Sequence, residues 1–301
     1  MKGISLGITN LIIVIFLAPL YEGVLRKVKA LIHSRMGPPV YQPYLDILKL
    51  LGKEDLRVSR NILIGLAPVV CFASIMMVAL FTPLGTIRSP LENYGDVIVL
   101  LYFIGLIAFS IMIGAAATIS PYAFVGLTRK MMLYLVLETV MVIAILTSVI
   151  KSGSFRISDM VTWYLQSGPQ FSMILAAIPF FLAIQGQLAK LPFDIAEADQ
   201  EIMEGVFIEA SGPRLALFKW SFFAKQIIYS SLFLELFCPW PKTYIIPIDI
   251  IINLVKVLIV MLLVGVIDVV NPRLRIDQAL KYYTGVSIVA LIALAFAIIG
   301  A

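Results

Sequence analysis

Long apolar segments alternate with shorter polar segments along almost the whole chain. A helix of about 20 apolar residues crosses a hydrocarbon layer roughly 30 Å thick. Eight segments have about this length, at about 4–25, 61–82, 96–117, 130–150, 171–189, 215–237, 244–267 and 283–300. This pattern predicts an all-α, polytopic membrane protein with about eight transmembrane helices. With no convincing internal repeat, we expect residues 1–301 to form a single integral membrane domain.

The loop after the first apolar segment contains a shorter amphipathic pattern, from Tyr44 to Leu56. Leucines recur there at helical spacing between charged residues; the residues concerned are Leu45, Leu48, Leu51, Asp46, Lys49, Lys53 and Glu54. Apolar residues three or four apart share one face of a helix. We therefore predict an amphipathic cytoplasmic helix at the membrane interface, with its basic residues toward water or a partner.

Composition and charge place these segments in a membrane and orient them. Hydrophobic residues make up 61% of the chain and charged residues 14%, outside the usual range of soluble domains. If the loops alternate between two sides, fifteen basic residues fall on one side and five on the other. Basic loop residues are enriched on the cytoplasmic side of membranes. This asymmetry predicts that both termini lie outside and that the acidic loop described below is cytoplasmic.

The chain offers few residues for cofactor chemistry. It has 2 cysteines, Cys71 and Cys238, far apart in or beside apolar segments, and 1 histidine, His33. We interpret both cysteines as buried small apolar residues rather than as metal ligands or disulfide partners. The sequence contains no glycine-rich phosphate-binding loop and no G-x-S-x-G sequence. We therefore expect no cofactor or metal on this chain, and any electron carriers on partner proteins.

A third of the acidic residues gather in one predicted loop. Six of the 18 are Asp194, Glu197, Asp199, Glu201, Glu204 and Glu209. If residues 190–204 form a helix, a stripe about 80° wide holds Lys190, Asp194, Glu197, Glu201 and Glu204, with Asp199 opposite and Glu209 outside it. Crowded, partly desolvated carboxylates lose their protons in coupled steps, and some of their pKa values rise. The pattern indicates a proton-exchanging cluster or, alternatively, a solvated acidic surface.

Further ionisable residues interrupt the apolar segments, where a charge is costly. Glu138 lies near the middle of the fourth segment, Lys225 in the sixth and Lys256 in the seventh. Such residues either form interhelical ion pairs that only hold the bundle together, or exchange protons. We expect Glu138 to be neutral or paired with one of these two lysines. Glu22 and Asp268, near predicted cytoplasmic ends, are explained by snorkelling or capping.

Four longer motifs follow one another along the chain. They are HSRMGPPVYQPYLDILKLLGKE (33–54), RKMMLYLVLE (129–138), KLPFDIAEADQEIMEGVFIEASGPRLALF (190–218) and NPRLRIDQAL (271–280). In these residues the chain resembles the membrane-embedded H subunit of NADH:quinone oxidoreductase, which is also called subunit 1 of respiratory complex I. The motifs span most of the chain, and eight membrane helices is also the number that this family has.

Two departures from the family's pattern indicate a branch. Pro38-Pro39 is followed almost at once by Gln42-Pro43, where quinone-reducing members have a longer insert, and Leu133 stands where those members usually have glutamine. The shortened segment resembles the membrane-bound, energy-converting NiFe hydrogenases and their sulfane-reductase relatives, which reduce no quinone. The resemblance therefore implies electron transfer from ferredoxin to protons or sulfur compounds, coupled to proton or sodium translocation.

Motif positions and buried ionisable residues together give the expected roles. The proton pathway is expected to comprise Glu138, Asp194, Glu197, Asp199, Glu201, Glu204, Glu209, Lys225 and Lys256. Docking or conformational coupling is expected at Arg35, Lys49, Lys53, Arg273, Arg275 and Asp277. No residue is expected to be catalytic in the redox reaction itself.

The resemblance also implies partners and a location. The chain would be the heel of a membrane arm, in contact with a NiFe-hydrogenase-like large subunit, an iron–sulfur small subunit and antiporter-like membrane subunits. Iron–sulfur clusters, or a NiFe centre, would reside on those partners, at the lipid bilayer of a prokaryotic cell (plasma) membrane and without nucleic acid. Two alternatives stay open: the equivalent subunit of a quinone- or methanophenazine-reducing oxidoreductase, and a stand-alone ion transporter.

Overall fold

The described residues form a bundle of long helices, with four shorter helical elements in the loops between them. It is a computed structural model that describes residues 2–56, 61–92 and 94–300, without the side chains of residues 2–4, 199 and 200. Arg57 and Arg60, two of the bases expected to be cytoplasmic, lie outside the described residues. The elements are α1 (Lys2–Ile32), α2 (Gln42–Leu51), α3 (Ile62–Phe81), α4 (Val97–Ala116), α5 (Pro121–Ser152), α6 (Ile157–Ser167), α7 (Phe171–Gln187), α8 (Asp199–Ile202), η1 (Gly205–Phe207), α9 (Gly212–Phe237), α10 (Ile246–Val270) and α11 (Ile276–Ile299).

The eight predicted apolar segments all coincide with helices, and the described residues contain no strand, so the all-α prediction is confirmed. Six of the described helices are long and apolar enough to cross a membrane: α1, α3, α4, α5, α10 and α11. The helix α7 is apolar but shorter, and α9 carries Lys219, Lys225 and Glu235 within its apolar sequence. The chain is a multi-pass membrane protein, and the number of eight crossings stays a prediction.

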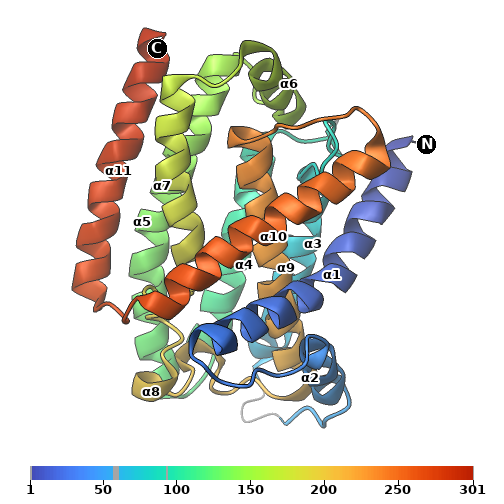
Figure 1. Ribbon diagram of the computed structural model, residues 1–301. Helices are drawn as coiled ribbons and strands as arrows, with labels where there is room; N and C mark the ends of the chain where they lie inside the picture. The colour runs from blue at the N-terminus through green and yellow to red at the C-terminus, as the bar shows by residue number, and fades with distance from the viewer. Residues whose placement is uncertain (1, 57–60, 93, 301) are drawn as a thin grey trace.

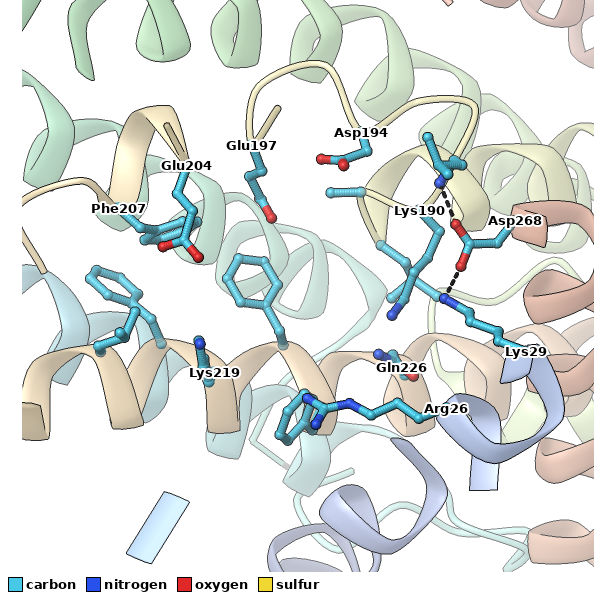
Figure 2. Close-up of a pocket in the computed structure, with 17 residues that line it drawn as sticks. Arg26, Lys29, Lys190, Asp194, Glu197, Glu204, Phe207, Lys219, Gln226 and Asp268 are labelled. Carbon is cyan, nitrogen blue, oxygen red and sulfur yellow. Dashed lines mark hydrogen bonds and ion pairs between the residues drawn. The ribbon is translucent and has the colours of Figure 1, made fainter. Parts of the chain in front are cut away.

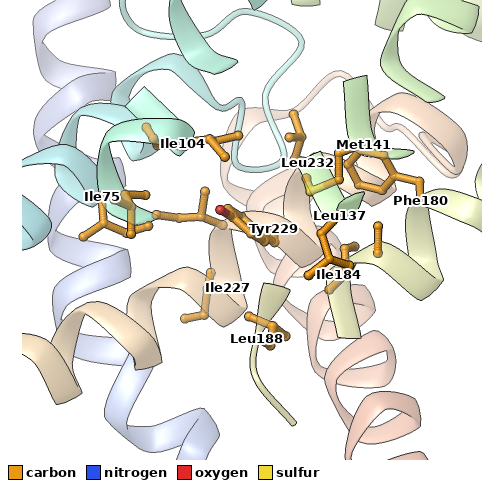
Figure 3. Packing of buried hydrophobic residues seen from close by; sticks show 14 of the residues in the cluster. Ile75, Ile104, Leu137, Met141, Phe180, Ile184, Leu188, Ile227, Tyr229 and Leu232 are labelled. Atoms are coloured by element: carbon orange, nitrogen blue, oxygen red, sulfur yellow. The ribbon is translucent and has the colours of Figure 1, made fainter. Parts of the chain in front are cut away.

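The helices pack in two groups around α9. On one side α5, α7 and α11 stand next to one another, and on the other α3 packs against α4 and α9 (Figure 1). The helix α10 crosses the bundle obliquely and contacts α1 and α9 (Figure 1). Most of α9 is buried, and Tyr229 and Leu232 lie near side chains of α5 and α7 in the core (Figure 3). An α9 buried on nearly all sides explains why its polar residues are tolerated.

The amphipathic helix predicted for residues 44–56 is present as the shorter α2, which ends at Leu51 with Gly52 as its C-cap. Pro43 and Ile47 face the protein, whereas Leu45 and Leu48 are 48% and 64% exposed. The helix lies against α1 and α9 at the end of the bundle that also carries α8 (Figure 1). The amphipathic pattern is therefore present in α2, and its position at the membrane interface stays a prediction.

Candidate functional site

A cavity of about 330 Å³ opens at the end of the bundle that carries α2 and α8. It lies between α1, α9, α10 and the loop after α7, and Figure 2 shows side chains from all four pointing toward it. Its charged and amide residues are Arg26, Lys29, Lys190, Asp194, Glu197, Glu204, Lys219, Gln226 and Asp268. Four cations therefore face four carboxylates, and phenylalanines of α9 line the remaining wall.

The acidic loop is not the helix on which the predicted stripe depends, so that prediction is wrong. Between residues 188 and 204 only α8 is helical, and Ala189, Met203 and Glu204 have left-handed backbones with φ of 49°, 48° and 61°. Left-handed residues of this kind interrupt a right-handed helix. Pro192 additionally lacks the N–H that a helix interior requires. The segment instead winds across the end of the bundle, which sends its side chains in different directions.

Three acids of this loop each form an ion pair with a basic residue from another part of the fold. The pairs are Asp194 with Arg273 at 2.8 Å, Glu197 with Lys130 at 2.8 Å, and Glu201 with Arg129 at 2.7 Å. The hydrogen bond from the Arg129 guanidinium holds the pKa of Glu201 below its usual value, opposite to the rise expected of a crowded cluster. The loop is thus a set of ion pairs with α5 and with the segment before α11.

The other three acids of the loop have different surroundings. Glu204 is exposed and lines the cavity. Glu209 lies apart from it, at a smaller cavity beside Arg214, and its buried Oε2 has no hydrogen-bond partner among the described residues. Asp199 begins α8, and its side chain is outside the part of the chain that the structure describes.

Glu22 and Asp268 are far more buried than snorkelling or capping requires, and that explanation is wrong. Each is 6% exposed. Glu22 accepts hydrogen bonds from Gln226 at 2.8 Å and from Lys190 at 3.3 Å. Asp268 pairs with Lys29 and accepts the Leu191 backbone N–H at 2.7 Å (Figure 2). These two carboxylates fasten the loop after α7 to α1, α9 and α10.

The residues expected to dock a partner surround the same end of the bundle. Arg35, Lys49 and Lys53 are exposed on the loop before α2, on α2 and just after it. Arg275 and Asp277 are exposed at the start of α11. Arg273 differs because it is half-buried and bound to Asp194. Five of the six side chains are therefore available to a partner.

Lys225 and Glu138 lie deeper in the bundle, beyond the Glu197–Lys130 pair. Lys225 is 2% exposed and donates to the Gln187 carbonyl oxygen at 2.7 Å and to the Gln187 side chain at 3.4 Å. Among the side chains that the structure describes, no carboxylate forms an ion pair with Lys225. Glu138 is half-buried on α5 and lines an outward-facing groove. The expected pair between Glu138 and a lysine is thus not formed.

Lys256 belongs to a different region. Its ammonium donates to the Cys238 carbonyl oxygen at 2.6 Å, just beyond the end of α9 that is remote from the acidic loop. The buried pair Glu235–Lys242, at 2.9 Å, lies in the same region. Cys238 itself is exposed, contrary to expectation, whereas Cys71 is buried. Lys256 is therefore not placed to connect Glu138 with the loop.

Several polar residues of the site were missed by the sequence reasoning. Gln226 follows Lys225 directly, Gln187 ends α7, and Tyr134 precedes Glu138 by one helical turn. Polar side chains in membrane-spanning helices usually face the protein interior, so the two glutamines could have been found by position. Among the described residues, no three His, Cys, Asp or Glu side chains are grouped as a metal site.

The comparisons with known proteins identify relatives that match most of the chain. Hydrogenase-4 component C of Escherichia coli (strain K12) is 32% identical over 270 residues, covering 87% of this chain and 85% of that protein. The H subunit of NADH-quinone oxidoreductase from Geobacillus sp. (strain WCH70) is 31% identical over 278 residues, covering 85% and 80%. A chain of the membrane-bound sulfane sulfur reductase, an archaeal respiratory membrane complex, has the same fold, with a TM-score of 0.90, 27% identity, and 99% and 100% of the two chains covered.

These relatives are subunits of multi-subunit redox complexes of membranes, and they come from both branches that the sequence pattern left open. The profile of the family described as NADH dehydrogenase matches residues 5–299, nearly the whole chain. The chain therefore belongs to the NADH dehydrogenase family.

Proposed function

We propose that this chain is the heel subunit of the membrane arm of a complex-I-like respiratory complex. In this role it docks the redox arm and couples electron transfer, from ferredoxin to protons or sulfur compounds, to proton or sodium translocation. The observation that carries the proposal is the succession of ionisable groups from the cavity, through the Glu197–Lys130 pair and Lys225, to Glu138. Relatives in hydrogenase and sulfane reductase complexes support it.

The redox arm docks on the end of the bundle that carries the cavity. Exposed bases before and after α2 attract a NiFe-hydrogenase-like large subunit and a small subunit that holds the iron–sulfur clusters. Two charges 4 Å apart interact by about 4 kcal/mol at an effective dielectric constant near 20. A change of charge at a nearby redox centre is therefore large enough to rearrange the ion pairs of the acidic loop.

A second partner covers the groove at Glu138. Tyr102 and Phe109, which line the groove, are 76% and 53% exposed on the surface of the isolated chain. A carboxyl group facing lipid at bilayer depth costs at least a few kcal/mol if ionised. A helix of an antiporter-like membrane subunit, with a polar group opposite Glu138, removes that cost. Glu138 is then the point at which protonation changes pass to the ion-translocating subunits.

Replacement of Glu138 by glutamine tests this proposal. Glu138→Gln keeps the shape of the side chain but removes its proton exchange, so ion uptake per electron should fall severalfold while the complex still assembles. The measurement is acceptor reduction and ion uptake by the same membrane vesicles. Glu92→Gln is the matched control, because Glu92 lies in the loop before α4, away from the groove, where it accepts a hydrogen bond from Ser158. Unchanged ion uptake per electron in Glu138→Gln would remove Glu138 from the coupling mechanism.

A further inference from the structure

Lys225 borders a very small internal cavity between α5, α7 and α9. The cavity has a volume of about 20 Å³, and a site needs roughly 10–15 Å³ on this measure to hold one water molecule. Lys130 and Gln187 also line it. The Gln187 Nε2 and the Tyr229 hydroxyl are buried without hydrogen-bond partners among the described residues. Buried polar atoms of this kind are normally satisfied, so they mark this part of the core as a place for water.

The groove on the other side of α5 is much larger and faces outward. Its volume is about 500 Å³, and its walls come from α4 and α5. Glu138 is the one carboxylate among its described lining residues, and the buried Glu138 Oε2 has no hydrogen-bond partner there. An acceptor in this position is available to a donor that comes from the interior of the protein.

Tyr134 is the one described residue that lines both the internal cavity and the groove. It is 7% exposed and lies one helical turn before Glu138, with its hydroxyl beside the Glu138 carboxyl group. Its ring packs edge-on against Phe109 of α4, with 6.0 Å between ring centroids. Gly105 leaves room for the hydroxyl, because a Cβ there would lie 3.1 Å from the Tyr134 oxygen.

Among the described residues of α5, no polar side chain other than Tyr134 lines both the internal cavity and the groove. Leu133 and Leu137 line the internal cavity on either side of it, and both are buried. Hydroxyl groups both donate and accept hydrogen bonds, so a tyrosine can receive one proton and release another. The Tyr134 hydroxyl lies between the internal cavity and the groove, where it can exchange hydrogen bonds and protons with groups on both sides.

We propose that the Tyr134 hydroxyl relays protons between Lys225, at the internal cavity, and Glu138, in the groove. The inference rests on the proposed coupling function. In the transfer, the Tyr134 O–H bond breaks as its proton forms an O–H bond with the Glu138 carboxylate. The Tyr134 oxygen takes a proton in return from the Lys225 ammonium, directly or through one water. Tyr134 ends unchanged, Lys225 becomes neutral, and Glu138 becomes a neutral carboxylic acid.

Substitution of Tyr134 by phenylalanine tests the relay in the complete complex in membrane vesicles. Tyr134→Phe keeps the ring and its packing on Phe109 but removes the hydroxyl. We expect ion uptake per electron to fall severalfold, with normal assembly and thermal stability. Tyr244→Phe is the matched control, since its side chain is exposed just before α10 and lines neither the groove nor the internal cavity. This control should behave as the unmodified protein does.

A second variant displaces the hydroxyl without removing it. Gly105→Ala puts a methyl group against the Tyr134 oxygen and should also lower ion uptake per electron, which keeps the test decisive if Tyr134→Phe fails to assemble. Normal coupling in Tyr134→Phe, together with loss of coupling in Glu138→Gln, would overturn the relay and leave the proposed function standing. Normal coupling in both variants would overturn the relay and the proposed function together.

Discussion

Glu22 and Lys225 are both charged residues buried within the helix bundle, but their surroundings differ. Glu22 accepts hydrogen bonds from Gln226, Lys190 and Arg26. Lys225 has two contacts with Gln187 and lies 5.1 Å over the Tyr229 ring, without a carboxylate partner among the described side chains. A buried ion pair that loses one partner leaves an uncompensated charge, whereas removal of an unpaired buried charge does not. The two residues should therefore respond differently to substitution.

Replacing each residue by a neutral one should show that the charge of Glu22 stabilises the fold, whereas the charge of Lys225 contributes little to stability. Glu22→Gln leaves Lys190 without its anion and should cost about 3 kcal/mol of stability. Lys225→Met removes a buried amine and should change stability by only about 1 kcal/mol, since the backbone and side-chain oxygens of Gln187 lose this donor. The measurement is the thermal unfolding midpoint of the purified complex in detergent. A larger loss of stability in Lys225→Met than in Glu22→Gln would contradict this assignment.

Sequence reasoning at this scale found which residues are ionisable but not how they pair. The cost of burying charge is enough to identify Glu138 and Lys225 from their positions in apolar segments. The same reasoning explained Glu22 and Asp268 by snorkelling or capping and missed their partners Lys190 and Lys29, which lie in or beside other helices. Pairing between residues 168 positions apart, as for Glu22 and Lys190, leaves no local signal in the sequence.

At the scale of elements, the acidic loop shows how local spacing and tertiary contacts compete. The carboxylates recur at three or four residues, as on one face of a helix. Their bases, however, come from α5 and from the segment before α11, and a single helical stripe cannot reach both. The Leu274 N–H also donates to the Pro192 carbonyl oxygen at 3.0 Å, which ties the loop to that segment. The long apolar helices were predictable because burial in lipid dominates their sequence, whereas the loop depends on distant partners.

The approach of α1 to the segment before α2 depends on one glycine. A Cβ at Gly23 would lie 1.8 Å from the Val40 carbonyl oxygen. Gly23→Ala must therefore push this segment, and α2 with it, away from α1, at a cost of about 1–3 kcal/mol. We expect proteolysis between residues 33 and 41 to become faster in Gly23→Ala. Gly285→Ala is the control, because among the described residues no atom beyond its chain neighbours and the adjacent backbone of α11 lies within 4 Å of the added methyl group. Equal proteolysis rates in the two variants would show that the close contact is not maintained.

At the scale of the whole molecule, the charged groups are concentrated at one end of the bundle. The cavity, the acidic loop and α2 share that end, while both chain ends lie toward the other (Figure 1). The apolar pattern predicted the order of the helices along the chain, and the family resemblance implied that the chain is part of a larger membrane arm. Neither the apolar pattern nor the resemblance indicated the oblique path of α10, which brings Asp268 to the cavity. Helix tilt follows from packing against neighbours and is not encoded in the length of an apolar segment.

Charge reversal at this end should release the redox arm. Arg35 and Lys53 are exposed, lie on either side of α2, and are free of ion pairs among the described side chains, so their substitution leaves the fold intact. With Arg35→Glu and Lys53→Glu together, an attraction between the bundle and an acidic docking surface becomes a repulsion, and such interactions weaken as salt increases. We expect the arm to separate from washed membranes in this double variant at a lower salt concentration than in the unmodified complex, as measured by the arm subunits remaining in the membrane pellet. Arg88→Glu with Arg156→Glu is the matched control, because both side chains are exposed at the opposite end. Equal retention of the arm in the two double variants across the salt range would place the docking surface elsewhere on the chain.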